Sequence, residues 1–84
     1  MATLEYSTRA ADWLRSAEPA ASEQVMKRIE QAEDFPEHFL SPLRGRSTYK
    51  LRAGEYRAEI EWRRNSDPEV LFVREIGHRD GFYD

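Results

Sequence analysis

The chain has 84 residues and a mass of 9.9 kDa, a length that fits one domain spanning residues 1–84. Hydrophobic residues make up 39% of it and aromatic residues 12%, which is too apolar for a disordered segment. There is no cysteine, which excludes disulfides, thiolate nucleophiles and cysteine metal sites. No apolar run approaches the roughly 18 residues of a membrane span, and the charged residues near the start argue against a secretory signal. We therefore expect a cytoplasmic protein without a membrane segment.

The charges are distributed unevenly along the chain. The 13 basic and 16 acidic residues give a net charge of −3. Residues 1–42 carry 4 basic and 8 acidic side chains, whereas residues 43–84 carry 9 and 8. Only Lys27 and Lys50 are lysines, so the basic residues are almost all arginines. An anionic partner is expected to bind where the basic residues gather, in the second half of the chain.

The N-terminal part of the sequence predicts one strand followed by two helices. Residues 3–7 alternate as a strand does, and Ser7 or Thr8 is suited to cap a helix from Arg9 to about Ala17. Pro19 ends that helix, and a second one is predicted over about residues 20–33. In both helices apolar residues recur at helical spacing, namely Ala10, Trp13, Leu14 and Ala17, and then Val25, Ile29 and Ala32. The two segments are expected to form an antiparallel helical hairpin.

The second half predicts an irregular crossing and then three strands. Residues 34–47 lack a regular pattern and contain two prolines and a glycine. Strands are predicted over residues 49–52, 55–62 and 70–76, with turns at 53–54 and 65–68. The expected fold class is α+β, with a two-helix hairpin packed on a small antiparallel β-sheet in the order β-α-α-β-β-β.

The first hairpin concentrates positive charge on one face. A turn at 53–54 would place Arg52 across from Glu55 and Lys50 across from Arg57. Like charges directly opposed on a sheet are unfavourable, so three cations on one face are suited to an anion such as a phosphodiester backbone. Further basic residues are expected at the rim of this patch: Arg44, Arg46 and Arg79. The alternative is that these arginines are simply solvated, with neighbouring glutamates as cross-strand partners.

The C-terminal residues favour an interaction with RNA. His78 and Arg79 follow the last strand, and Phe82 and Tyr83 come shortly after them. Aromatic side chains that stack on bases, together with cations that contact the backbone, are typical of single-stranded RNA recognition. The alternative is that the two aromatic residues pin the C-terminus to the core.

The order of these motifs resembles the RelE toxins of the RelE/ParE superfamily. The resemblance rests on Tyr49-Lys50-Leu51-Arg52, then Gly54-Glu55-Tyr56-Arg57, then Ile76-Gly77-His78-Arg79 with Tyr83 four residues on. It covers nearly the whole chain. It implies a RelE-like toxin of a type II toxin–antitoxin system that cleaves mRNA in the ribosomal A site. The reaction is attack of a ribose 2′-OH on the adjacent phosphate, and it uses no metal or other cofactor.

The resemblance also implies the catalytic residues. Lys50 matches the first lysine of the family's catalytic strand, and Arg52 falls where a second lysine is found in the family. The other matches are Arg57, Arg79 and the C-terminal Tyr83, with Arg44, Arg46 and Phe82 as further RNA-binding residues. Because a guanidinium is effectively always protonated, Arg52 is suited to hold charge and poorly suited to act as a base. The general base is then Lys50, Tyr83 or His78, the last being the residue whose ordinary pKa lies near neutrality.

Two departures from the pattern of the RelE family leave other functions open. The chain is acidic, whereas ribosome-acting relatives are strongly basic, and its lysine-poor composition is typical of a halophilic source such as a halophilic archaeon. The alternatives are a ParE-like gyrase inhibitor without nuclease activity and a degenerate, non-catalytic relative. The expected partners are the ribosome with its mRNA and a cognate RelB-like antitoxin, which would form a toxin–antitoxin heterotetramer. His38 is expected at the surface and has no spacing typical of a metal ligand.

Overall fold

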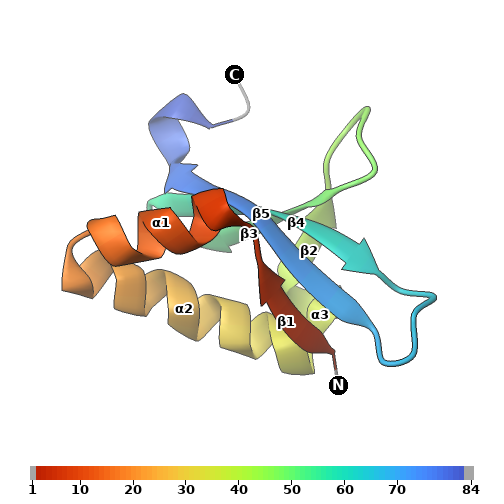
Figure 1. Ribbon diagram of the computed structural model, residues 1–84. Coiled ribbons are helices and arrows are strands. Elements are labelled where there is room, and N and C mark those ends of the chain that lie inside the picture. Colours follow the sequence, from red (N-terminus) through yellow and green to blue (C-terminus); the bar gives the residue numbers. More distant parts are fainter. Residues whose placement is uncertain (1, 83–84) are drawn as a thin grey trace.

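Two helices lie on one side of a five-stranded sheet in the computed structural model, which describes residues 2–82 (Figure 1). The elements in chain order are β1 (Thr3–Tyr6), α1 (Thr8–Ser16), α2 (Pro19–Asp34), α3 (Pro36–Phe39), β2 (Leu40–Pro42), β3 (Tyr49–Ala53), β4 (Tyr56–Arg63), β5 (Val70–His78) and a 3₁₀ helix (Arg79–Gly81). The α+β class predicted from the sequence is confirmed.

The two long helices begin where the sequence predicts. The side-chain oxygen of Ser7 accepts a hydrogen bond from the backbone N–H of Ala10 at 3.0 Å, so Ser7 is the N-cap of α1. α2 starts at Pro19, a residue suited to the first helical turn because its missing N–H would have no partner there. The predicted stripe of α2 is buried against the sheet, with Val25 and Ile29 almost fully enclosed.

The sheet is mixed, which corrects the prediction of an antiparallel sheet. The strand order is β1-β5-β4-β3-β2, and β1 pairs with β5 in parallel while the other neighbours are antiparallel. Parallel pairing requires a long crossover connection, and here all the elements between β1 and β5 provide it. The pattern of a single strand does not reveal the direction of its partner, so the sequence could not show this.

The segment over residues 34–47 is more regular than predicted. It contains the single-turn helix α3 and the three-residue edge strand β2, which pairs with β3. Both elements are too short to show a periodic pattern in the sequence. At the other end of the sheet, β5 continues two residues beyond its predicted end, to His78.

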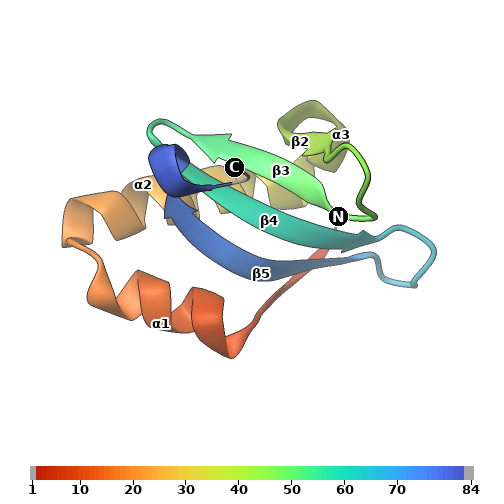
Figure 2. The ribbon, with the colours of Figure 1, turned by 90° about the horizontal axis from the view of Figure 1, so that it is seen from above.

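The two faces of the sheet differ in what covers them. One face packs against α1 and α2 and forms the hydrophobic core. The largest fully buried side chains of the core are Val25, Ile29, Leu51, Ile60, Leu71 and Val73. We call the opposite side the open face; it carries Lys50, Arg52, Arg57, Glu59 and Glu61, which alternate with the core residues of β3 and β4. Figure 2 looks onto the open face, with α2 behind the strands.

The β3–β4 hairpin turns one residue later than predicted. Gly54 takes the first loop position with φ of +62°, a conformation that glycine adopts at little cost, and Ala53 stays in the strand. As a result Arg52 lies opposite Arg57 and Lys50 lies opposite Glu59, whereas the predicted partners were Glu55 and Arg57. Because the pairing moves by two residues, every side chain keeps its predicted face.

Candidate functional site

Three cations share the open face near the end of the β3–β4 hairpin. Arg52 is exposed and stands directly across from Arg57, and Lys50 is half-buried two residues along β3 from Arg52. Neither Lys50 nor Arg52 has a carboxylate within ion-pair distance among residues 2–82. Two like charges opposed on neighbouring strands repel each other. An anion placed between them would therefore be stabilised.

The guanidinium of Arg57 is held in place by the backbone of its own hairpin. Its Nη1 donates to the carbonyl oxygens of Gly54 and Tyr56, each at 2.7 Å. The side chain thus folds toward the turn. A guanidinium fixed in this way has a defined orientation at the hairpin end, and an oriented planar guanidinium suits recognition of a phosphate.

The C-terminal segment returns to the same end of the sheet. The backbone N–H of Arg79 donates to the carbonyl of Glu55 in the hairpin turn at 2.8 Å, and the Arg79 side chain is more than half exposed. The ring of Phe82 lies against Gly77, the cross-strand partner of Arg57 on the open face. Arg79 and Phe82 are therefore brought to the hairpin end, while Tyr83 lies outside the described residues.

The loop between β2 and β3 is held onto the open face by a buried carboxylate. Glu59 accepts a hydrogen bond from the Thr48 hydroxyl at 2.7 Å and lies 3.4 Å from Nη1 of Arg46. Thr48 and Glu59 are the buried polar residues of the described chain. The loop carries the exposed Arg44 and Arg46, both predicted at the rim of the patch. This anchor was not predicted, although a glutamate between Ala58 and Ile60 in a strand was a signal for it.

His78 points away from the three cations. It pairs with Tyr56 across β4 and β5, and the two rings pack edge to face with centroids 5.7 Å apart. The ring of Tyr56 packs in turn on Trp13 of α1, 5.5 Å away. The structure therefore places His78 at the helix-covered side of the sheet end, whereas Lys50 and the arginines lie on the open face.

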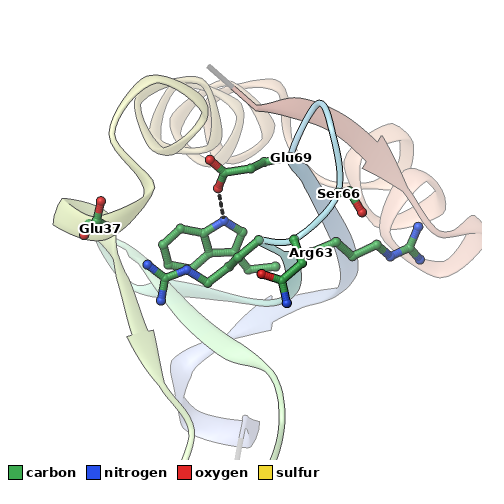
Figure 3. Close-up of a pocket in the computed structure, with 7 residues that line it drawn as sticks. Glu37, Arg63, Ser66 and Glu69 are labelled. Atoms are coloured by element: carbon green, nitrogen blue, oxygen red, sulfur yellow. Dashed lines mark hydrogen bonds between the residues drawn. The ribbon is translucent and has the colours of Figure 1, made fainter.

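A surface hollow lies elsewhere, at the β4–β5 turn. It is lined by seven residues (Figure 3): Glu37, Trp62, Arg63, Arg64, Asn65, Ser66 and Glu69. The indole N–H of Trp62 donates to Glu69 at 2.8 Å, and the guanidinium of Arg64 lies over the indole ring, 4.0 Å from its centroid. None of the predicted site residues within residues 2–82 lines this hollow.

Residues 2–82 contain neither a cluster of metal-ligating side chains nor a helix suited to span a membrane. No group of three or more histidine, aspartate or glutamate side chains there is arranged to hold a metal ion. No helix of the described chain is long and apolar enough to cross a membrane. His38 is exposed on α3, where its ring packs on Phe39.

Comparison with known proteins identifies the fold. No protein-family model and no curated protein matches the sequence. Among solved structures, the chain is similar to a component of the Mycobacterium tuberculosis RelBE2 toxin–antitoxin complex, with a TM-score of 0.79, 21% identity, and coverage of 93% of this chain and 98% of that one. It is also similar to a chain of the intact E. coli RelBE complex, with a TM-score of 0.71, 27% identity, and coverage of 93% and 96%.

An archaeal structure gives the same result. The match to the RelB–RelE complex of Methanococcus jannaschii has a TM-score of 0.68 and 21% identity, and covers 95% of both chains. The fold is therefore that of the small toxins of the RelE/ParE superfamily. The chain is structurally similar to the RelE toxins of RelBE complexes.

Proposed function

We propose that this chain is the toxin of a type II toxin–antitoxin pair and a ribosome-dependent mRNA endoribonuclease that cleaves in the A site without a metal. The observation that carries the proposal is the shared position of Lys50, Arg52 and Arg57 on the open face, with Arg79 brought to the same end. The geometry supports the proposal because cations from β3, β4 and the C-terminal segment lie at the same end of the sheet. Such an arrangement suits a bent RNA backbone.

The reaction would proceed by internal attack within the RNA. The ribose 2′-oxygen forms a bond to the adjacent phosphorus and the bond from phosphorus to the 5′-oxygen breaks, leaving a 2′,3′-cyclic phosphate and a free 5′-hydroxyl. Arg52 and Arg57 would stabilise the negative charge that develops on the phosphorane oxygens. Arg79 would hold the neighbouring backbone, while Arg44, Arg46 and Phe82 would bind RNA beyond the scissile link.

The proton transfers need a base for the 2′-OH and an acid for the leaving oxygen. Lys50 and Tyr83 are the candidates that we retain for these roles, since Lys50 lies beside the two arginines. His78 is the weaker candidate, because its ring faces Tyr56 on the other side of the sheet end.

The proposed partner is a RelB-like antitoxin in a toxin–antitoxin heterotetramer. The solved structures that this chain resembles are complexes of RelE with RelB. A protein that acts on translating ribosomes would work in the cytoplasm. An acidic antitoxin segment over the open face would cover Lys50 and Arg52, which have no ion pair within residues 2–82.

The test is cleavage of mRNA on programmed ribosomes, with the ends of the fragments mapped by primer extension. We expect the parent chain to cut within the A-site codon, and the Arg52→Ala and Arg57→Ala variants to cut about 100-fold more slowly or worse. The matched control is Arg15→Ala, which removes an exposed arginine from α1 on the helical side. Uncut mRNA with bound ribosomes would indicate a non-catalytic relative, and double-strand DNA breaks in cells would indicate a gyrase inhibitor.

A further inference from the structure

His78 is engaged on both ring nitrogens by groups that belong to two other segments. Its Nδ1 accepts a hydrogen bond from the backbone N–H of Asp80 at 3.2 Å, so it is the N-cap of the 3₁₀ helix. Its Nε2 lies 3.3 Å from Oε1 of Glu55 in the β3–β4 turn. The Asp80 N–H is a donor, so Nδ1 accepts from it, although Oδ2 of Asp80 also lies 3.5 Å from Nδ1. In the neutral ring the proton is then on Nε2 and points to Glu55.

The imidazole ring of His78 also packs against an aromatic side chain. Its edge-to-face contact with Tyr56, and the contact of Tyr56 with Trp13, form an aromatic row from α1 to the end of β5. This row fixes the plane of the imidazole and hence the direction of its two nitrogens. A ring held this way is suited to orient its neighbours.

The C-terminal segment that His78 contacts contains a proposed catalytic residue. The segment that starts at His78 includes Arg79, whose own backbone N–H donates to the carbonyl of Glu55 at 2.8 Å. Glu55 is therefore contacted twice, once through its carbonyl and once through its carboxylate. These two contacts and the Asp80 cap join the C-terminal segment to the hairpin turn that follows Arg52.

We infer that His78 is a positioning residue, which docks the C-terminal segment on the β3–β4 turn and so places Arg79 beside Arg52 and Arg57 for RNA cleavage. The inference rests on the proposed function for its catalytic consequence. It differs from an acid–base role because the Nδ1 lone pair is used inside the protein and the Nε2 proton is directed at Glu55. No bond to RNA is made or broken by the ring.

Two amide replacements separate the roles of the two nitrogens. In His78→Asn the side-chain oxygen can occupy the place of Nδ1 and accept from Asp80, whereas in His78→Gln the polar atoms reach toward the place of Nε2. We expect His78→Asn to cleave within about threefold of the parent rate, and His78→Gln and His78→Ala to cleave about five- to tenfold more slowly, as for the loss of one capping hydrogen bond. The matched control is His38→Asn, on the exposed surface of α3.

A second measurement does not depend on cleavage. Hydrogen exchange of the Asp80 and Arg79 amides reports whether the segment is docked, in the full chain and without ribosomes. We expect faster exchange of both amides in His78→Ala than in the parent, and restored protection of Asp80 in His78→Asn. If the parent chain does not cleave mRNA, the proposed function fails while the exchange result still decides whether His78 positions the segment.

Three results would overturn the inference. The first is equal exchange of the Asp80 amide in the parent, His78→Asn and His78→Ala. The second is loss of cleavage in His78→Asn as complete as in His78→Ala, with unchanged thermal unfolding. The third is restoration of the His78→Ala rate by added imidazole, which would assign the ring to proton transfer.

Discussion

The aromatic ring of Phe82 packs directly on the backbone of Gly77. A Cβ added at Gly77 would lie 3.0 Å from Cδ1 of Phe82. The contact lies on the open face, because Gly77 pairs with Arg57. The absence of a side chain at this position is what allows the C-terminal segment to lie close to the last strand. The ring thereby shields the end of β5 beside the proposed site.

The first prediction follows from this contact. Gly77→Ala forces the ring to move and is expected to lower the free energy of unfolding by about 1 kcal/mol, a typical cost of overpacking. The measurement is a double-mutant cycle with Phe82→Ala by urea unfolding. In the Phe82→Ala background the cost of Gly77→Ala should disappear, and an equal cost in both backgrounds would show that the contact is not the cause.

The opposition of Arg52 and Arg57 predicts a conflict between stability and activity. Arg52→Thr removes the cross-strand repulsion, so we expect the free energy of unfolding to rise by about 0.2–1 kcal/mol at low salt. The gain should shrink at high salt, where the repulsion is screened, while RNA cleavage falls. Arg74→Thr is the control, because Arg74 is an exposed arginine of β5 with no arginine opposite it in the described register. A gain in the control of the same size would assign the effect to strand propensity.

The buried carboxylate of Glu59 predicts a strong dependence of the β2–β3 loop on one side chain. Glu59→Ala leaves the enclosed Thr48 hydroxyl without its acceptor and should cost about 1–3 kcal/mol of folding free energy. Glu59→Gln keeps an oxygen for Thr48 and loses the negative charge, so its cost should be clearly smaller. Urea unfolding of the two variants checks this, and equal losses would show that the charge facing Arg46, rather than the hydrogen bond, holds the loop.

The hydroxyl of Tyr6 predicts a loss of stability in alkaline solution. Burial raises the pKa of Tyr6 above its usual value, and the carboxylates of Glu30 and Glu33 raise it further. Between the ordinary pKa of about 10 and the raised one, the unfolded chain releases a proton that the folded chain keeps, so stability falls as pH rises. In Tyr6→Phe this contribution is absent, and thermal unfolding from pH 9 to 11 should decline less steeply than in the parent. Parallel declines would contradict the assignment.

The helices were the most predictable part of the fold. Val25, Ile29 and Ala32 recur at helical spacing and are all buried, and Ser7 caps α1 as its position suggested. Periodicity can be read over two or more turns. It cannot be read over β2 or α3, which have three and four residues, and it carries no information on the direction in which β1 pairs.

For the candidate site, the sequence predicted the face of the sheet on which each side chain lies. It did not predict the contacts that these side chains make. Strand alternation places Lys50, Arg52 and Arg57 on one face for any two-residue loop, because moving such a loop by one residue moves the pairing by two. The same alternation puts His78 on the side of Ile76 once β5 is known to reach residue 78. The bonds of the Arg57 guanidinium and the anchor at Glu59 depend on side-chain conformation, which a pattern of residue types does not contain.

The parallel pairing of β1 with β5 has a consequence for how the chain is made. The strand partner of residues 3–6 is the segment of residues 70–73. During synthesis, β1 therefore has no partner for this pairing until β5 has been made. Closing such a distant contact is slow compared with forming a helix. The parallel strand pair can therefore form only after β5 has been made, and shortened products that end before β5 would lack the strand partner of β1.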